Sequence, residues 1–136
     1  MHTEVVTYEA DGLSMRGHLY VDGGGSGRPG VLVFPEAFGL SEHAKLQAER
    51  LAHLGYVGLA CDLHGEGKLL SDREAALAII KELSNDPPRI RARANGGLQV
   101  LRLRPEADPS RIAAIGYCFG GTWLSNWPAA AARSSE

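Results

Sequence analysis

The most informative stretch of the sequence is Arg111-Ile-Ala-Ala-Ile-Gly-Tyr-Cys-Phe-Gly-Gly121. An apolar run leads into Gly116-x-Cys118-x-Gly120, and the residues that follow are able to begin a helix. A nucleophile elbow requires this order, because a sharp strand-to-helix turn raises the reactive side chain above the sheet edge. The small residues Gly116 and Gly120 remove the clashes in such a turn. The alternative is a small buried cysteine in a glycine-rich turn, and the preceding apolar run favours the elbow.

The expected position of Cys118 at a helix N-terminus has chemical consequences. Unpaired backbone N–H groups at this end of a helix favour a thiolate and lower the pKa of the thiol. The same N–H groups are able to hold the oxyanion that forms when a nucleophile attacks a carbonyl group. The pattern therefore indicates a cysteine nucleophile.

A second informative stretch is Val31-Leu-Val-Phe-Pro-Glu-Ala-Phe-Gly-Leu40. Its carboxylate, Glu36, comes directly after a short apolar strand, at the edge where open parallel sheets place their ligands. The residue that follows such a strand is also able to supply a second oxyanion N–H. On this stretch alone, an ordinary loop glutamate facing water is the simpler interpretation.

The rest of the chain alternates between apolar runs and amphipathic segments. Short apolar runs predict buried strands, and apolar residues three and four apart predict helices. The turn dipeptide Asp11-Gly12 predicts a leading antiparallel hairpin. The predicted strands are 3–8, 13–21, 31–34, 56–61 and 112–115. The first predicted helix runs from 41 to about 54, the second begins at the box 71–74 and includes 76–83, and the third includes 90–102. This order implies an α/β fold, with a mostly parallel sheet flanked by helices and the hairpin at its edge.

Several residues predict where the helices begin and end. Ser41 is the expected N-cap of the first helix, and Gly55 is its expected C-cap glycine. Ser71-Asp-Arg-Glu74 reads as a capping box for the second helix. Pro87-Pro88 either ends that helix or begins the next one. Gly96-Gly97 costs about 1 kcal/mol per residue relative to Ala unless close packing requires it.

Composition restricts the possible functions. The 136 residues suit one domain, 1–136, and a formal charge of −2 gives no indication of nucleic-acid binding. The apolar runs are shorter than the ~20 residues of a membrane helix, so no membrane partner is expected. Two cysteines and no basic-then-apolar leader favour a cytoplasmic protein with free thiols, in which Cys61 is an inert core residue.

No cofactor or metal is expected. Gly25, Gly27 and Gly30 fit the dinucleotide fingerprint, but they precede a strand instead of opening a helix. Gly65-Glu-Gly-Lys68 lacks the earlier glycine of a phosphate loop. No group of Cys and His has the spacing of metal ligands.

Four motifs together resemble the dienelactone hydrolase family of α/β-hydrolases. They are Glu36-Ala-Phe-Gly-Leu40, Leu54-Gly-Tyr-Val57, Asp62-Leu-His-Gly-Glu-Gly67 and Gly116-Tyr-Cys-Phe-Gly-Gly121. The resemblance covers the chain from about Val31 to Gly121, and the leading hairpin also fits. It implies the N-terminal portion of an α/β-hydrolase fold and a carboxylic-ester hydrolase of the dienelactone type.

The resemblance also implies roles for individual residues. Cys118 is the nucleophile, and Glu36 takes its proton when an ester or lactone substrate binds. The backbone N–H groups of Phe119 and Ala37 form the oxyanion hole, and Gly116 and Gly120 are the elbow glycines. An acyl-enzyme forms and is then hydrolysed.

The chain departs from the family pattern after the nucleophile. In α/β-hydrolases an acid and then a histidine follow the nucleophile in chain order. None of the residues after Cys118 is Asp or His, and all five histidines come earlier. His64, in the loop after a predicted strand, is the histidine at the expected edge of the sheet. The alternative to an active hydrolase is therefore a non-enzymatic, truncated remnant of one.

Residues 123–136 form an atypical tail. Pro128 and the tryptophans Trp123 and Trp127 stand where the elbow's helix is expected to continue with an apolar stripe. A one-base frameshift after Thr122 is a hypothesis that accounts for the conflict, because with suitable codons for residues 124–126 the restored frame encodes an apolar helical opening. The alternative is an Ala-rich end that frays in solvent. Sequencing the gene distinguishes the two, since the shifted frame is expected to encode two more strands with an Asp and then a His.

Overall fold

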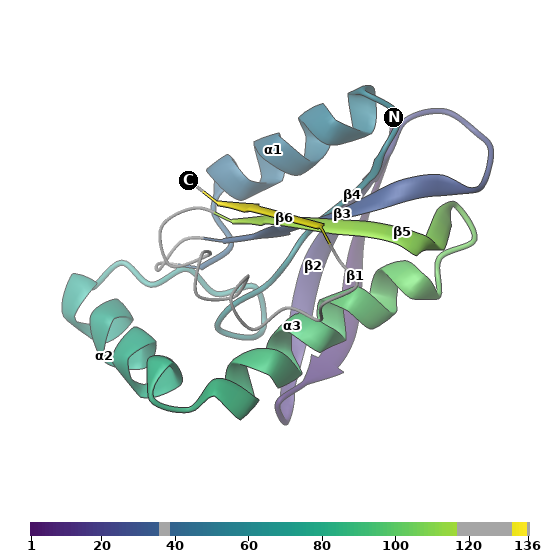
Figure 1. Ribbon diagram of the computed structural model, residues 1–136. Helices are drawn as coiled ribbons and strands as arrows, with labels where there is room; N and C mark the ends of the chain where they lie inside the picture. The colour runs from purple at the N-terminus through teal and green to yellow at the C-terminus, as the bar shows by residue number, and fades with distance from the viewer. Residues whose placement is uncertain (36–38, 117–131, 136) are drawn as a thin grey trace.

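The protein is an α/β structure built on one mixed sheet. The computed structural model describes residues 1–35, 39–116 and 132–135 (Figure 1). The sheet has the strand order β1-β2-β4-β3-β5-β6. Its strands are β1 (His2–Ala10), β2 (Leu13–Val21), β3 (Arg28–Phe34), β4 (Val57–Ala60), β5 (Ala107–Gly116) and β6 (Ala132–Ser135). The helices are α1 (Glu42–His53), α2 (Arg73–Ser84) and α3 (Pro87–Arg102). The predicted fold class is confirmed.

The leading hairpin is formed by β1 and β2, which pair antiparallel from His2 with Val21 to Ala10 with Leu13. Its two-residue turn has positive φ at Asp11 (54°) and Gly12 (70°). Two successive positive φ values give the type I′ turn that matches the twist of paired strands. The strand β1 lies at one edge of the sheet, as predicted.

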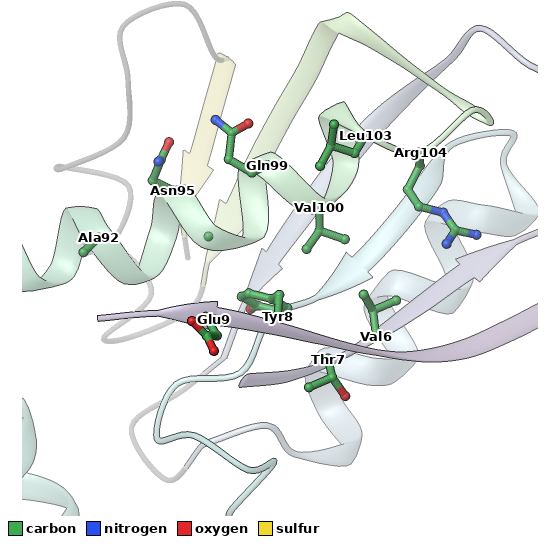
Figure 2. Close-up of a pocket in the computed structure, with 11 residues that line it drawn as sticks. Val6, Thr7, Tyr8, Glu9, Ala92, Asn95, Gln99, Val100, Leu103 and Arg104 are labelled. Atoms are coloured by element: carbon green, nitrogen blue, oxygen red, sulfur yellow. The ribbon is translucent and has the colours of Figure 1, made fainter. Parts of the chain in front are cut away.

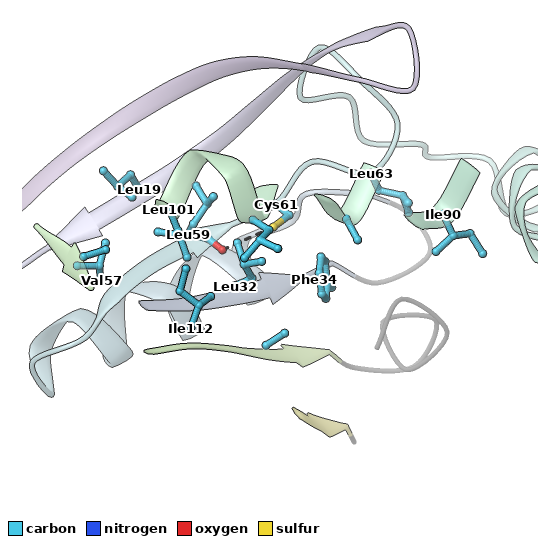
Figure 3. Packing of buried hydrophobic residues seen from close by; sticks show 14 of the residues in the cluster. Leu19, Leu32, Phe34, Val57, Leu59, Cys61, Leu63, Ile90, Leu101 and Ile112 are labelled. Atoms are coloured by element: carbon cyan, nitrogen blue, oxygen red, sulfur yellow. Dashed lines mark hydrogen bonds between the residues drawn. The ribbon is translucent and has the colours of Figure 1, made fainter. Parts of the chain in front are cut away.

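The helices cover both faces of the sheet. In Figure 1, α1 lies on one face and α3 on the other. The α1 side is lined by small side chains of the helix, Ala44, Ala48 and Ala52, which pack against Val33 and Ala60. The α3 side holds a larger cluster that includes Leu32, Leu59 and Leu101, shown around Cys61 in Figure 3. Strands covered in this way on both faces account for the uninterrupted apolar runs in β3 and β4.

Tyr20 breaks the alternation of buried and exposed residues along β2. It is 6% exposed although its position falls on the polar side of the strand. Its ring joins the cluster beneath α1, so this end of β2 is covered on both faces.

The helix boundaries follow the predicted signals with one correction. Ser41 is the N-cap of α1, and Gly55 follows its C-cap with φ of 100°. The predicted box at Ser71 is wrong by one residue, because Asp72 is the N-cap of α2 and its carboxylate accepts a hydrogen bond from the Glu74 N–H. An ionised Asp at this position also interacts favourably with the helix dipole. Pro87 begins α3.

Close packing explains the two glycines inside α3. A Cβ atom added at Gly96 would lie 2.6 Å from the Cβ of Ala10. One added at Gly97 would lie 3.0 Å from the Sγ of Cys61. The helix therefore approaches Ala10 of β1 and Cys61, the residue after β4, at distances that only glycine permits. This close packing offsets the low helix propensity of the two glycines.

On the far side of the sheet, a short strand covers β5. The strand β6 pairs parallel to β5 from Ala113 with Ala132 to Gly116 with Ser135. The strand β5 also begins at Ala107, before the predicted start. The edge on this side is β6 itself.

Candidate active site

The three central strands end together at one edge of the sheet. Phe34 of β3 is the register partner of Gly116 of β5, and Val33 is the partner of Ala60 of β4. Ligands of open α/β sheets bind outside the carboxyl ends of the strands. The segments that follow β3, β4 and β5 therefore leave the sheet from neighbouring positions.

Gly116 is the one predicted site residue within the described part of the chain. It is buried and is the last residue of β5, the position that an elbow requires of the glycine before its nucleophile. The other predicted residues lie outside the described residues: Glu36, Ala37, Cys118, Phe119 and Gly120. The register partners Phe34 and Gly116 each precede one of the two predicted catalytic residues by two positions.

Asp62 organises the loop after β4. Its carboxylate is 3% exposed and accepts hydrogen bonds from the N–H groups of Arg16 (3.0 Å), Gly65 (3.3 Å) and Gly67 (2.7 Å). Gly65 and Gly67 adopt positive φ, which lets the backbone turn both N–H groups toward one carboxylate. The sequence analysis assigned no role to Asp62. The available signal was an Asp directly after a buried strand, followed by two glycines at close spacing.

His64 lies on this loop, beside the segment that follows β3. A Cβ atom added at Gly39 would lie 2.9 Å from Cδ2 of His64 and would overlap the carbonyl oxygen of Lys68. Gly39 also forms an antiparallel bridge with Leu69. With φ of 108° and no room for a side chain, position 39 requires glycine. His64 is half-buried. Gly39, the position beside its ring, follows Glu36 by three residues in the sequence.

Cys61 does not have the properties of a nucleophile. It is completely buried, and burial, with a smaller contribution from the Asp62 charge, raises the pKa of its thiol far above the ordinary value. Its S–H group donates to the carbonyl oxygen of Leu59 at 3.9 Å (Figure 3). The prediction that Cys61 is an inert core residue is confirmed, because a buried neutral thiol is a poor nucleophile.

The other histidines lie on the helix and strands: His2, His18, His43 and His53. His53 is exposed and its Nδ1 lies 3.2 Å from the carboxylate of Asp22. Burial, together with the positive charge of Lys45, lowers the pKa of His18. His64 is thus the histidine carried by a loop at the carboxyl edge.

A pocket of about 510 Å³ lies between β1 and α3. Figure 2 shows Val6 and Tyr8 of β1 facing Val100 of α3, with Asn95 and Gln99 beside them. Its cationic residue, Arg104, already pairs with Glu4 at 3.1 Å and Glu106 at 3.2 Å. The lining contains neither Cys nor His, so the pocket lacks the nucleophile chemistry expected of the site.

The described residues were also searched for metal ligands and membrane-spanning helices. Within residues 1–35, 39–116 and 132–135, no group of three or more His, Cys, Asp and Glu side chains is arranged to hold a metal ion. None of the helices in the same part of the chain combines the length and apolar character needed to cross a membrane.

The sequence and the fold were compared with known proteins. The sequence model of the dienelactone hydrolase family matches residues 15–132. A Methylorubrum extorquens protein named "Putative carboxymethylenebutenolidase" is 32% identical over 100 residues, which cover 71% of this chain and 34% of the relative. The solved structure named m3DLH is 45% identical, with a TM-score of 0.88, over 92% of this chain and 52% of that one. A dienelactone hydrolase-like promiscuous phosphotriesterase from metagenomic libraries is 40% identical, with a TM-score of 0.87 over the same shares.

The fold and its carboxyl-edge loops define an α/β-hydrolase. The chain belongs to the dienelactone hydrolase family. It spans about half the length of the two solved relatives and about a third of the Methylorubrum protein.

Proposed function

We propose that this chain carries the nucleophile and the proton acceptor of a cysteine hydrolase that cleaves an ester or a lactone. Cys118 is the nucleophile, and Glu36 is the base that takes its proton. The N–H groups of Phe119 and Ala37 hold the oxyanion. Gly116 and Gly120 give the elbow its sharp turn.

The observation that carries the proposal is the register of β3 and β5. Phe34 and Gly116 are partners on adjacent parallel strands, which lie about 4.8 Å apart. Glu36 comes two positions after Phe34, and Cys118 comes two positions after Gly116. The segments that carry them therefore leave the sheet from neighbouring positions. Membership of a hydrolase family supports the same reaction class.

The proposed reaction has two steps. The Glu36 carboxylate accepts the thiol proton, and the thiolate attacks the carbonyl carbon of the substrate to form a tetrahedral oxyanion. The oxyanion collapses, the C–O bond to the leaving group breaks, and the departing alkoxide takes the proton back from Glu36. Water then hydrolyses the thioester, which releases the acid and restores the thiol.

The second step is expected to be slow in a polypeptide limited to these 136 residues. The eighteen residues after Cys118 contain neither Asp nor His, and a His–Asp pair normally activates the hydrolytic water in this fold. Oxyanion stabilisation and binding alone retain about 10³–10⁴-fold acceleration over water. For a polypeptide of residues 1–136 we therefore expect acyl-enzyme formation with turnover below the range of about 1–10³ s⁻¹ that is usual for enzymes.

The test is acylation by an aryl ester. Purified protein mixed with p-nitrophenyl acetate is expected to release a burst of nitrophenol, and mass spectrometry is expected to find one acetyl group on Cys118. Glu36→Gln is expected to slow the burst by about 10²–10⁴-fold, the range for loss of a general base. Cys61→Ala serves as the control and is expected to keep the burst.

The alternative is a non-enzymatic member of the family. In that case neither a burst nor an acetylated Cys118 forms. Faster modification of Cys61 than of Cys118 by iodoacetamide in folded protein would likewise contradict the elbow assignment. Turnover in the usual enzymatic range would instead contradict the expected slow second step.

A further inference from the structure

Arg93 is a buried cation on α3. Its side chain is 5% exposed. A guanidinium group taken out of water costs several kcal/mol unless good hydrogen bonds compensate for the lost hydration. Its partners therefore show what the group holds in place.

Arg93 joins the hairpin turn to the loop after β4. Its Nε donates to Oδ2 of Asp11 at 2.9 Å, and its Nη1 donates to the carbonyl oxygen of Leu63 at 2.7 Å. A charged donor to a buried carbonyl is among the stronger hydrogen bonds in proteins. The loop residue next to Leu63 is His64.

The same loop is fixed from a second side. The carboxylate of Asp62 accepts the Arg16 N–H of β2 and the N–H groups of Gly65 and Gly67. His64 thus lies between two anchors, Asp62 before it and the Arg93–Leu63 bond beside it. Its ring contacts position 39, and its Nδ1 is buried.

Arg89 provides an internal comparison. Its Nε donates to the same Oδ2 atom of Asp11 at 3.1 Å, while its Nη1 donates to Glu82 of α2 at 2.7 Å. Both arginines therefore hold the hairpin turn, and they differ in the second partner. For Arg93 that partner is the loop at the carboxyl edge of the sheet.

We propose that Arg93 is a positioning residue of the active site, acting through the Leu63 carbonyl to hold His64 against Gly39. This role rests on the proposed function, which places the reaction at the same edge. Without the Nη1 bond, the loop loses its anchor to α3, and His64 moves away from Gly39. Displacement of a site wall by about 1 Å is enough to cost up to about 10²-fold in rate.

The experiment uses two matched substitutions. In Arg93→Gln the amide nitrogen takes the place of Nε and still donates to Asp11, whereas the donor to Leu63 is lost. Arg89→Gln makes the same truncation and loses the bond to Glu82 instead. Both proteins are compared with the parent at conditions where each is fully folded by circular dichroism.

Two readouts are measured for each variant. The first is the NMR signal of the His64 ring, assigned from its absence in His64→Gln. The second is the rate of acylation by p-nitrophenyl acetate. Arg93→Gln is expected to shift the His64 signal and to slow acylation about tenfold to hundredfold. Arg89→Gln is expected to leave the signal in place and the rate within about twofold.

A second variant covers the case in which Arg93→Gln does not fold. Arg93→Lys keeps a cation beside Asp11, and its ammonium ends one atom short of Nη1. Arg93→Lys is expected to shift the His64 signal and to slow acylation in the same direction as Arg93→Gln, but by smaller amounts. An active parent in which the Arg93 and Arg89 variants behave alike would overturn this inference alone. A parent that forms no acyl-enzyme would overturn the proposed function and this role with it.

Discussion

Asp62 and Arg93 are both ionisable and both buried, and both form hydrogen bonds with backbone groups of the loop after β4. Three N–H groups point at the Asp62 carboxylate, and the Leu63 carbonyl accepts from Arg93. Removing one member of such an arrangement leaves the other polar groups buried without partners, which typically costs 3–5 kcal/mol. These two residues therefore fix loop geometry with more precision than apolar contacts provide.

Asp11 gives the stability of the protein a defined dependence on pH. Burial alone raises the pKa of its carboxyl group, but hydrogen bonds from Arg93 and Arg89 outweigh burial and leave the pKa below the usual 3.8. A lowered pKa in the folded protein means that stabilisation is complete above the unfolded pKa. It is lost as the pH falls through the lower folded value.

Asp11→Asn tests this dependence. Asn tolerates the positive φ at this position, so the substitution removes mainly the charge. The variant is expected to lose about 1–3 kcal/mol of unfolding free energy at pH 7, the range for hydrogen bonds to a charged group. In urea titrations the difference from the parent is expected to shrink below about pH 4. A difference that stays constant from pH 7 to pH 3 would contradict the assignment.

At the scale of elements, α1 lies unusually close to the sheet. Its inner face consists of Ala44, Ala48 and Ala52, and the strand beneath it carries Gly58. A Cβ atom added at Gly58 would overlap the carbonyl oxygen of Ala48. Small residues on both surfaces let the helix backbone approach the strand backbone, and the packing density there depends on all of them.

Gly58→Ala tests this contact. The added methyl group meets helix backbone, which is unable to move like a flexible side chain, so α1 must shift. We expect a loss of about 1–3 kcal/mol, the range for overpacking. Gly24→Ala is the matched control, because nothing lies within 4 Å of its added Cβ atom, and a change within about 0.5 kcal/mol is expected. Equal unfolding midpoints for the two variants would show that α1 has room to adjust.

At the scale of the whole molecule, the two sides of the sheet end differently. On one side the edge is β1, a strand of nine residues; on the other, β6 covers β5 with four residues. The pairing of β6 with Ala113, Ala114 and Ile115 uses backbone groups that an uncovered β5 would present to other chains. An unprotected apolar edge strand is a template for aggregation.

Removal of residues 132–136 tests the protection that β6 provides. The shortened protein is expected to aggregate faster, measured by light scattering at equal concentration, because β5 becomes the edge. Replacing the deleted residues by a Gly-Ser segment of the same length controls for chain length and is expected to aggregate as the deletion does. Unchanged scattering in both proteins would show that β6 does not protect this edge.

Features that depend on neighbouring residues were predicted from the sequence, whereas features that depend on residues far apart in the sequence were not. The hairpin, Gly55 and the apolar stripe of α3 were predicted because each signal lies within a few residues of the structure it produces. Asp72 was missed as the cap because two capping residues stand side by side and only packing selects between them. Arg93 was missed because its partner Asp11 lies 82 positions away in the sequence, which no local pattern reports.

The register that joins Phe34 to Gly116 also has a consequence for the order of folding. The β1–β2 hairpin closes through a two-residue turn, whereas β3 finds β5 only after the 82 positions between these two partners have been brought together. Loop-closure entropy makes such non-local pairings slow, and local hairpins form within about 1–10 μs. During synthesis the chain therefore acquires its hairpin early and completes the proposed reactive edge late. Before β5 pairs with β3, Cys118 is an ordinary thiol without the neighbours that the proposed mechanism requires.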